Sequence, residues 1–282
     1  MSQATQPASS ATNRYSVRIG AWRLGLIGFL VIAPAVLLWA KAPIVQPESY
    51  HDFADTRAAL GVRNAGDVLS NLAFIAVGIY GMFIAWRCAT AMRLAWVCLF
   101  TGVTLVSIGS AYYHWAPTSD SLIWDRLPMT IGFMALFTAM VGEYISETWG
   151  RRLLLPMLLL GLSSVIYWDV SGDLSFYAWV QFTPLLIIAV LPLTLKSAYT
   201  HSWCLLAALS IYILAKVVEH ADTAVFSLSG HLISGHTLKH LLAAVGVYLI
   251  AYMLGQRKLR ADMEPVQRLS SAKSSALAAE SE

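Results

Sequence analysis

The stretch HTLKHLLAAVGVYLIAYML at positions 236–254 joins two histidines to an almost unbroken apolar run. A helix of this length extends about 28 Å, close to the ~30 Å hydrocarbon core of a bilayer. The stretch therefore predicts a membrane-spanning helix. Seven more apolar stretches of about 17–25 residues precede it, roughly at 21–40, 67–86, 92–113, 126–145, 152–168, 177–195 and 201–219. The sequence thus predicts an all-α fold, a polytopic membrane helix bundle with eight spans.

The composition of the 282-residue chain agrees with a membrane protein. Hydrophobic residues make up 57% and charged residues 12%, and the mean hydropathy is +0.62. Soluble domains carry about 25% charged residues, so the composition excludes an ordinary soluble domain. The net charge of +3 gives no reason to expect a nucleic-acid partner. The three cysteines, at 88, 98 and 204, have no metal-ligand spacing and predict neither a disulfide framework nor a thiolate site.

Polar segments divide the chain into a core with additions on either side. Serine and alanine are frequent near both ends, which predicts disordered tails. The first span is too long for the apolar part of a cleavable signal peptide. We therefore expect a disordered cytoplasmic tail at 1–20, an extra N-terminal transmembrane helix at 21–40, an outer linker at 41–66, a seven-helix core at 67–254 and a second disordered cytoplasmic tail at 255–282.

Lysine and arginine are unevenly divided between the two sides of the predicted bundle. Lys216 and Lys239 fall within spans. With the N-terminus inside, 13 of the 19 basic residues fall in inside segments, and the four in outside segments are Lys41, Arg57, Arg63 and Arg126. Short cytoplasmic loops are enriched in these residues. We therefore expect both termini in the cytoplasm and the polar residues described next toward the extracytoplasmic face.

Histidines at three positions share one membrane depth. His236 and His240 are four residues apart, so their imidazoles leave the same face of a helix. His114 lies at the matching end of another span. Three neutral histidines with an open fourth position are typical of catalytic zinc, and ionisable groups inside a bilayer are functional candidates. The alternative is a set of interfacial histidines that hydrogen-bond to their neighbours.

Ser110 and Asp125 lie near His114 in the sequence. Ser110 comes one helical turn before His114, and Asp125 follows it across a short turn. Taken singly, the serine is explained as a packing residue and the aspartate as a helix N-cap. Together these residues form Ser-x3-His-x10-Asp, followed at a distance by His-x3-His. The whole constellation is much more specific than any of its parts.

These residues, within the segments GSAYYH at 109–114, DRLPM at 125–129 and SGH at 234–236, resemble the alkaline ceramidases, as does DVLSN at 67–71. That family belongs to a wider superfamily of seven-helix membrane hydrolases that also contains the adiponectin receptors. The resemblance covers about residues 52–254. It implies one zinc ion held by His114, His236 and His240, with Ser110 and Asp125 beside the zinc-bound water. It also implies a membrane lipid substrate, ceramide or another N-acyl lipid, and hence a part in sphingolipid metabolism.

The resemblance further implies a calcium site in the linker before the second span. The family has an acidic motif there, and the matching residues here are Asp52, Asp55 and Asn64. Arg57 stands where an oxygen ligand is expected, whereas calcium takes six to eight oxygen ligands. The alternative is an Asp–Arg ion pair that orders the linker.

The resulting expectation is an integral-membrane, zinc-dependent amidohydrolase. Zinc would activate a water molecule, Asp125 would move its proton to the leaving nitrogen, and Ser110 would hydrogen-bond the developing oxyanion. Two alternatives stay open. One is a lipid ester hydrolase of the same superfamily, and the other is a non-catalytic, receptor-like protein with structural zinc. Glu219 and His220 lie at the same depth and are further candidates for orienting a ligand histidine.

Overall fold

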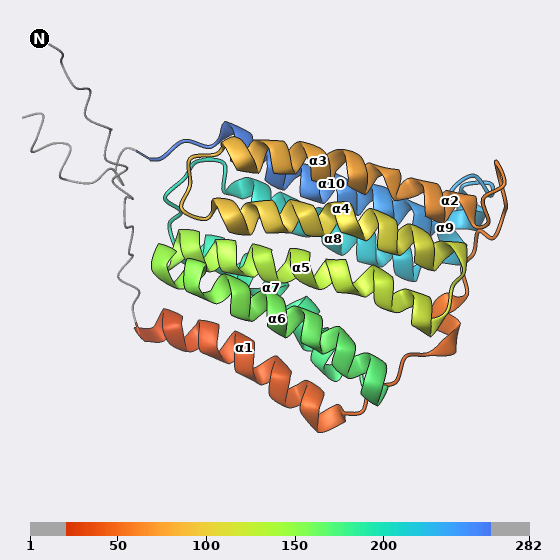
Figure 1. The fold of residues 1–282 in the computed structure, drawn as a ribbon, viewed down its shortest axis with the longest axis horizontal. Coiled ribbons are helices and arrows are strands. Elements are labelled where there is room, and N and C mark those ends of the chain that lie inside the picture. The colour runs from red at the N-terminus through yellow and green to blue at the C-terminus, as the bar shows by residue number, and fades with distance from the viewer. Residues whose placement is uncertain (1–20, 261–282) are drawn as a thin grey trace, which may run out of the picture.

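The computed structural model describes residues 21–260, and this part of the chain folds as an all-α bundle without β-strands. Eight helical segments are long and apolar enough to cross a membrane, so the protein is a multi-pass membrane protein. Figure 1 shows them side by side along a common direction. The helices are α1 (Ala21–Lys41), η1 (Glu48–His51), α2 (Ala65–Ser70), α3 (Leu72–Arg87), α4 (Arg93–Trp115), α5 (Ser119–Tyr144), α6 (Glu147–Ser171), α7 (Ser175–Thr194), α8 (Trp203–His220), α9 (Asp222–Leu228) and α10 (Gly235–Gln256). The tail expected at 1–20 and most of the tail expected at 255–282 lie outside the described residues.

The predicted spans all correspond to helices, but one boundary differs in a way that matters for the site. α5 begins at Ser119 rather than near 126. The side chain of its N-cap residue Thr118 accepts a hydrogen bond from the Ser121 N–H, and the Thr118 N–H donates to Ser121 Oγ. This capping box starts the helix inside a polar stretch that the apolar pattern does not mark. Asp125 therefore lies in the second turn of α5, and its interpretation as an N-cap is wrong.

Two glycines allow helices to approach closely where the polar residues gather. A Cβ atom at Gly109 would overlap the backbone of Trp124, and one at Gly235 would overlap the backbone of Val218. Small residues permit such close contacts between membrane helices. Gly109 thereby lets α4 lie against α5 beside Ser110, and Gly235 lets the start of α10 lie against the end of α8.

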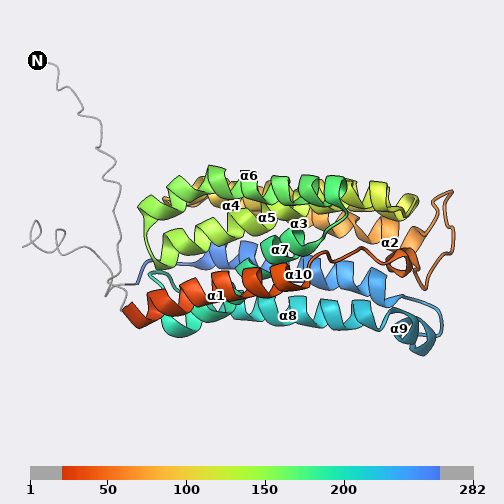
Figure 2. The ribbon, with the colours of Figure 1, turned by 90° about the horizontal axis from the view of Figure 1, so that it is seen from below.

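The two ends of the bundle carry different features. α2 and α9 lie at one end, here called the site end (Figure 1). The start of α1 and the end of α10 lie at the opposite end, here called the termini end (Figure 2). Both ends of the described chain are thus on one side of the bundle, as an even number of spans requires.

The first helix lies at the edge of the bundle. α1 packs against α7, where Trp179 Nε1 donates a hydrogen bond to the Val31 carbonyl at 2.9 Å. No residue of α1 is buried. The main hydrophobic core is instead built from α3 to α8 and α10. α1 therefore lies outside the main hydrophobic core, and the expected seven-helix core stays a prediction.

Candidate metal centre

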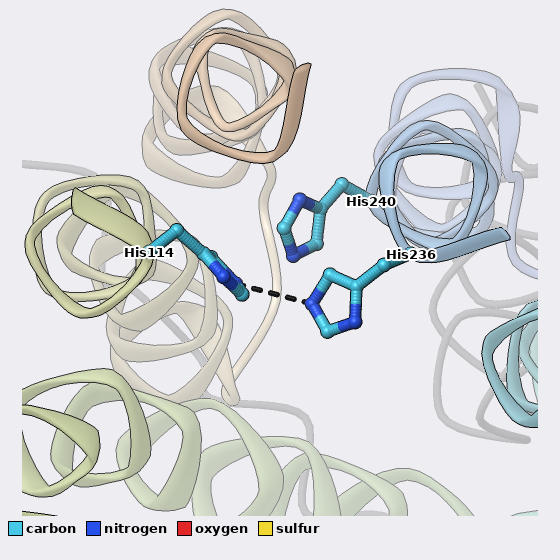
Figure 3. A group of neighbouring side chains, drawn as sticks. All are labelled: His114, His236 and His240. Atoms are coloured by element: carbon cyan, nitrogen blue, oxygen red, sulfur yellow. Dashed lines mark hydrogen bonds between the residues drawn. The ribbon is translucent and has the colours of Figure 1, made fainter. Parts of the chain in front are cut away.

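Three histidine side chains meet at the site end of the bundle (Figure 3). His114 comes from the last turn of α4, and His236 and His240 come from the first two turns of α10. Their exposed fractions are 0%, 4% and 4%. One ring nitrogen of each lies within 4.8 Å of the others, and the Nε2 atoms of His114 and His236 are 3.1 Å apart. The predicted convergence of these histidines is confirmed.

The start of α10 is held in a way that fixes both of its histidines. The side chain of its N-cap residue Ser234 accepts a hydrogen bond from the Thr237 N–H at 2.9 Å. Asp67 Oδ1 accepts hydrogen bonds from Thr237 Oγ1 at 2.7 Å and from Ser234 Oγ at 3.2 Å. Asp222 Oδ1 accepts one from the His236 N–H at 2.8 Å. Two carboxylates, from α2 and α9, thus secure the first turn of α10, where the helix dipole favours negative charge.

The hydrogen bonds around His240 assign its ring proton. Ser70 Oγ donates to the Asp67 carbonyl at 3.0 Å and lies 2.8 Å from His240 Nδ1. Because a serine hydroxyl has a single proton, Ser70 accepts a hydrogen bond from the Nδ1–H of His240. The Nε2 lone pair of His240 is then free to bind another group. A partner that fixes the second ring nitrogen in this way is typical of metal-ligating histidines.

One pair of ring nitrogens is spaced as the ligands of a zinc ion would be, and each of the three rings offers a nitrogen within 4.8 Å of the others. Zinc–nitrogen bonds of about 2.0–2.1 Å in a tetrahedron separate the ligand nitrogens by about 3.3–3.4 Å. The observed 3.1 Å between the Nε2 atoms of His114 and His236 is close to this value. His114 Nδ1, the other nitrogen of this ring, is buried and has no hydrogen-bond partner among residues 21–260, so this ring, unlike that of His240, is not fixed by a second partner. The chain therefore provides a three-histidine group that could hold a metal and is compatible with zinc.

An apolar cavity of about 200 Å³ adjoins the histidines. His240, Ser110 and Asp125 line it, together with mainly apolar side chains of α3, α4, α5, α7, α8 and α10. Ser110 is 2% exposed, and it lines this cavity together with the Asp125 side chain. The two residues expected to act in the chemistry thus share a cavity with one of the histidines.

An aromatic side chain of the linker between α1 and α2 covers the histidines. The ring centroid of Phe53 lies 4.8 Å from that of His114 and 4.5 Å from that of His236. The next residue, Ala54, donates its N–H to Asp222 Oδ2 at 2.9 Å. Asp222 therefore joins the linker to the start of α10, and Phe53 shields the histidine group on this side.

The residues considered for calcium have other partners. Arg57 donates to both carboxylate oxygens of Asp55, from Nε and Nη2, each at 2.7 Å. The Arg57 guanidinium holds the pKa of the Asp55 carboxyl below its usual range. Asn64 Nδ2 donates to the His114 carbonyl at 2.8 Å, and Asp52 is exposed. These contacts support the ion-pair interpretation of the linker, and Asn64 helps to hold the end of α4.

A charged cluster in the same cavity is a feature that the sequence reasoning missed. Glu219 of α8 forms ion pairs with Lys216 of the same helix and, at 2.6 Å, with Lys239 of α10. All three side chains line the cavity. Glu219 therefore contacts lysines instead of the expected ligand histidine, and His220 is exposed. The spacing of Lys216 and Glu219, three residues apart on one helix, is the sequence signal that could have indicated their pairing.

Comparisons of this chain with protein-family models and with curated proteins found no match. The resemblance to the alkaline ceramidases therefore stays an interpretation of the motif. Independently of it, the chain forms a multi-pass bundle in which three buried histidines could hold a metal ion.

Proposed function

We propose that the protein is an integral-membrane, zinc-dependent hydrolase that cleaves the amide bond of an N-acyl lipid such as ceramide. One observation carries the proposal. A histidine of the metal-binding group, a serine and an aspartate line one cavity whose remaining walls are mainly apolar. An acyl chain suits such walls, while the polar residues meet the amide.

His114, His236 and His240 would hold the zinc ion, which supplies a Lewis acid for the substrate carbonyl and lowers the pKa of a water molecule to about 7. The Asp125 carboxylate accepts a proton from the attacking water and returns it to the leaving nitrogen. The Ser110 hydroxyl donates a hydrogen bond to the oxygen on which negative charge develops. The amide C–N bond breaks, a C–O bond forms, and the products are a fatty acid and an amine.

The same cavity argues against a purely structural metal. A structural zinc site is closed by four protein ligands, and the metal-binding group of the described residues contains three. His240 belongs to that group and lines the cavity, so a small molecule in the cavity has access to the metal-binding group. This observation favours an enzyme over a receptor in which zinc only maintains the fold.

The substrate is tested by incubating the purified protein with matched N-acyl and O-acyl lipids and identifying the products by mass spectrometry. Release of fatty acid from the N-acyl lipids, and its loss in His240→Ala, is the expected result. Cleavage of O-acyl lipids alone would favour the ester hydrolase. Cleavage of neither class by zinc-loaded protein would contradict an enzymatic function and favour the receptor.

The proposed enzyme has both termini in the cytoplasm and its histidine group toward the extracytoplasmic face. The bias of lysine and arginine toward the inside segments supports this orientation. In a chain without native cysteines, Leu228→Cys at the site end should react with a membrane-impermeant thiol reagent on intact cells. Arg152→Cys, near the start of α6, should react only after lysis. The opposite labelling pattern would show that the protein has the reverse orientation in the membrane.

A further inference from the structure

The ion pairs around Glu219 leave one positive charge over. Both carboxylate oxygens of Glu219 are used, Oε1 by Lys239 and Oε2 by Lys216. Each ammonium group has three N–H donors and spends one on Glu219. Within residues 21–260 the remaining donors of these two lysines have no protein acceptor. A triad of two cations and one anion is therefore only partly neutralised.

The surplus charge lies in the wall of the apolar cavity. Lys216 and Lys239 both line it, together with Asp125, Ser110 and His240. The side chain of Lys239 is 17% exposed and that of Lys216 is 41% exposed. Charge at the depth of membrane helices is costly and is normally paired. An arrangement that keeps unpaired ammonium donors at a cavity wall is therefore expected to receive a partner from outside the chain.

Asp125 does not remove this surplus. Its carboxylate lies within electrostatic range of Lys239 and Glu219, but it lines the same cavity as His240 of the histidine group, where a bound divalent ion would add further positive charge. The contacts of Lys216 and Lys239 with Glu219 are hydrogen-bonded, whereas neither lysine has a recorded hydrogen bond to Asp125. The lysines thus remain available to a ligand that occupies the cavity.

We infer that Lys216 and Lys239 bind an anionic head group, a carboxylate or a phosphate, of the acyl lipid that occupies the cavity. This inference rests on the proposed function for the identity of the ligand as an acyl lipid. It narrows the substrate from N-acyl lipids in general to those with an anionic head group, in place of the neutral head group of ceramide. The acyl chain lies along the apolar walls, the scissile bond lies at Ser110, Asp125 and His240, and the head-group anion lies at the lysines. Ammonium groups recognise both anions through charge-assisted hydrogen bonds.

Binding is measured with lipids that have no scissile bond, so that turnover does not interfere. Oleyloxyacetate carries a carboxylate, 2-(oleyloxy)ethyl phosphate carries a phosphate, and 2-(oleyloxy)ethanol is neutral. The zinc-loaded, full-length protein in neutral detergent should bind one or both anions about tenfold to a hundredfold more tightly than the alcohol. The anion that binds more tightly identifies the head-group class. Equal affinity for all three probes would overturn the inference.

Variants locate the preference at the cluster. Lys216→Met leaves Glu219 paired with Lys239 and removes the surplus charge. The ratio of the affinity for the anionic probes to that for the alcohol should therefore fall toward one. Lys216→Arg retains the charge and should retain the preference. Lys258→Met, which removes an exposed lysine at the termini end, is the matched control. A preference that survives in Lys216→Met, or that falls equally in Lys258→Met, would place the anion elsewhere and contradict the inference.

Turnover separates this inference from the proposed function. The parent protein should hydrolyse N-oleoylglycine, or the phosphate ester of N-oleoylethanolamine, with a higher kcat/KM than N-oleoylethanolamine. Hydrolysis of all three without preference would support the hydrolase and overturn the head-group inference. Tight, Lys216-dependent binding of the anionic ethers without hydrolysis of any lipid would support the anion site and contradict the proposed function.

Discussion

The bundle buries ionisable side chains at both of its ends, and the two groups differ in how their polar atoms are used. At the termini end, Glu143 accepts hydrogen bonds from Trp96 Nε1 and Arg257 Nη1, each at 2.8 Å. The Arg257 guanidinium also lies over the Tyr199 ring, 4.3 Å from its centroid. One anion meets one cation, and none of these residues lines the apolar cavity. We call this group the Glu143 cluster.

At the site end the balance is different. The three histidines direct ring nitrogens toward one another, and the two lysines around Glu219 outnumber it. Several of these residues line the cavity with Ser110 and Asp125. A buried pair that is matched within the protein needs no external partner, and removing one of its members is costly to the fold. Ring nitrogens gathered around one point and lysine N–H groups at a cavity wall are instead suited to a metal ion and a ligand.

The largest expected effect is on the histidines. His114→Ala, His236→Ala and His240→Ala should each reduce bound zinc from about one per chain and lower hydrolysis to background, because a three-histidine site loses a ligand. Elemental analysis and lipid turnover measure the two effects. His220→Ala, which removes an exposed histidine at the same end, is the control and should keep both. Full zinc in all three variants would assign the metal elsewhere.

Asp125→Asn should separate chemistry from metal binding. The variant should keep normal zinc and a normal melting temperature, while the rate of hydrolysis falls by about 10²–10⁴, the usual contribution of a general base. Asp169→Asn on the exposed face of α6 is the matched control. Unchanged turnover in Asp125→Asn would remove Asp125 from the mechanism.

Ser70→Ala should weaken the metal site without removing a ligand. Ser70 fixes the ring of His240 through Nδ1, and loss of such a partner typically costs about 10-fold to 100-fold in metal affinity. Competition with a zinc chelator measures this change. Ser163→Ala, on the exposed face of α6, should leave the affinity as it is. Equal affinities in both variants would mean that Ser70 does not position His240.

The smallest expected effect on function is at the Glu143 cluster. Glu143→Gln removes the carboxylate that pairs with buried Arg257, so the free energy of unfolding should fall by about 1.5–3 kcal/mol. Zinc content and turnover should stay at the level of the parent when both are measured in detergent at a temperature where the variant is still folded. A large loss of activity in a folded Glu143→Gln variant would break the contrast between the two ends.

Much of this organisation could be predicted from the sequence. Long apolar runs located all eight spans, because a bilayer imposes both their length and their composition. The spacing of His236 and His240 on one helix, and the matching depth of His114, predicted their convergence. Each of these features depends on helix geometry and membrane thickness. Both leave a pattern in the local sequence.

Contacts between distant segments could not be predicted in this way. The start of α5 depends on side-chain hydrogen bonds at Thr118, which lies outside any apolar run. Asp67 reaches across to Thr237, and Lys239 reaches across to Glu219. These pairs are set by which helices become neighbours and by how closely glycines allow them to approach. A single sequence without periodicity at those positions carries no signal for them.

The central claim is that three histidines hold zinc and leave one position open for catalysis. X-ray absorption spectroscopy of the purified, zinc-loaded protein tests it most directly. The account predicts three imidazole nitrogens at about 2.0–2.1 Å and one oxygen from a non-protein ligand, with this pattern lost in His240→Ala. A spectrum with four protein ligands, or a zinc environment unchanged in His240→Ala, would contradict it.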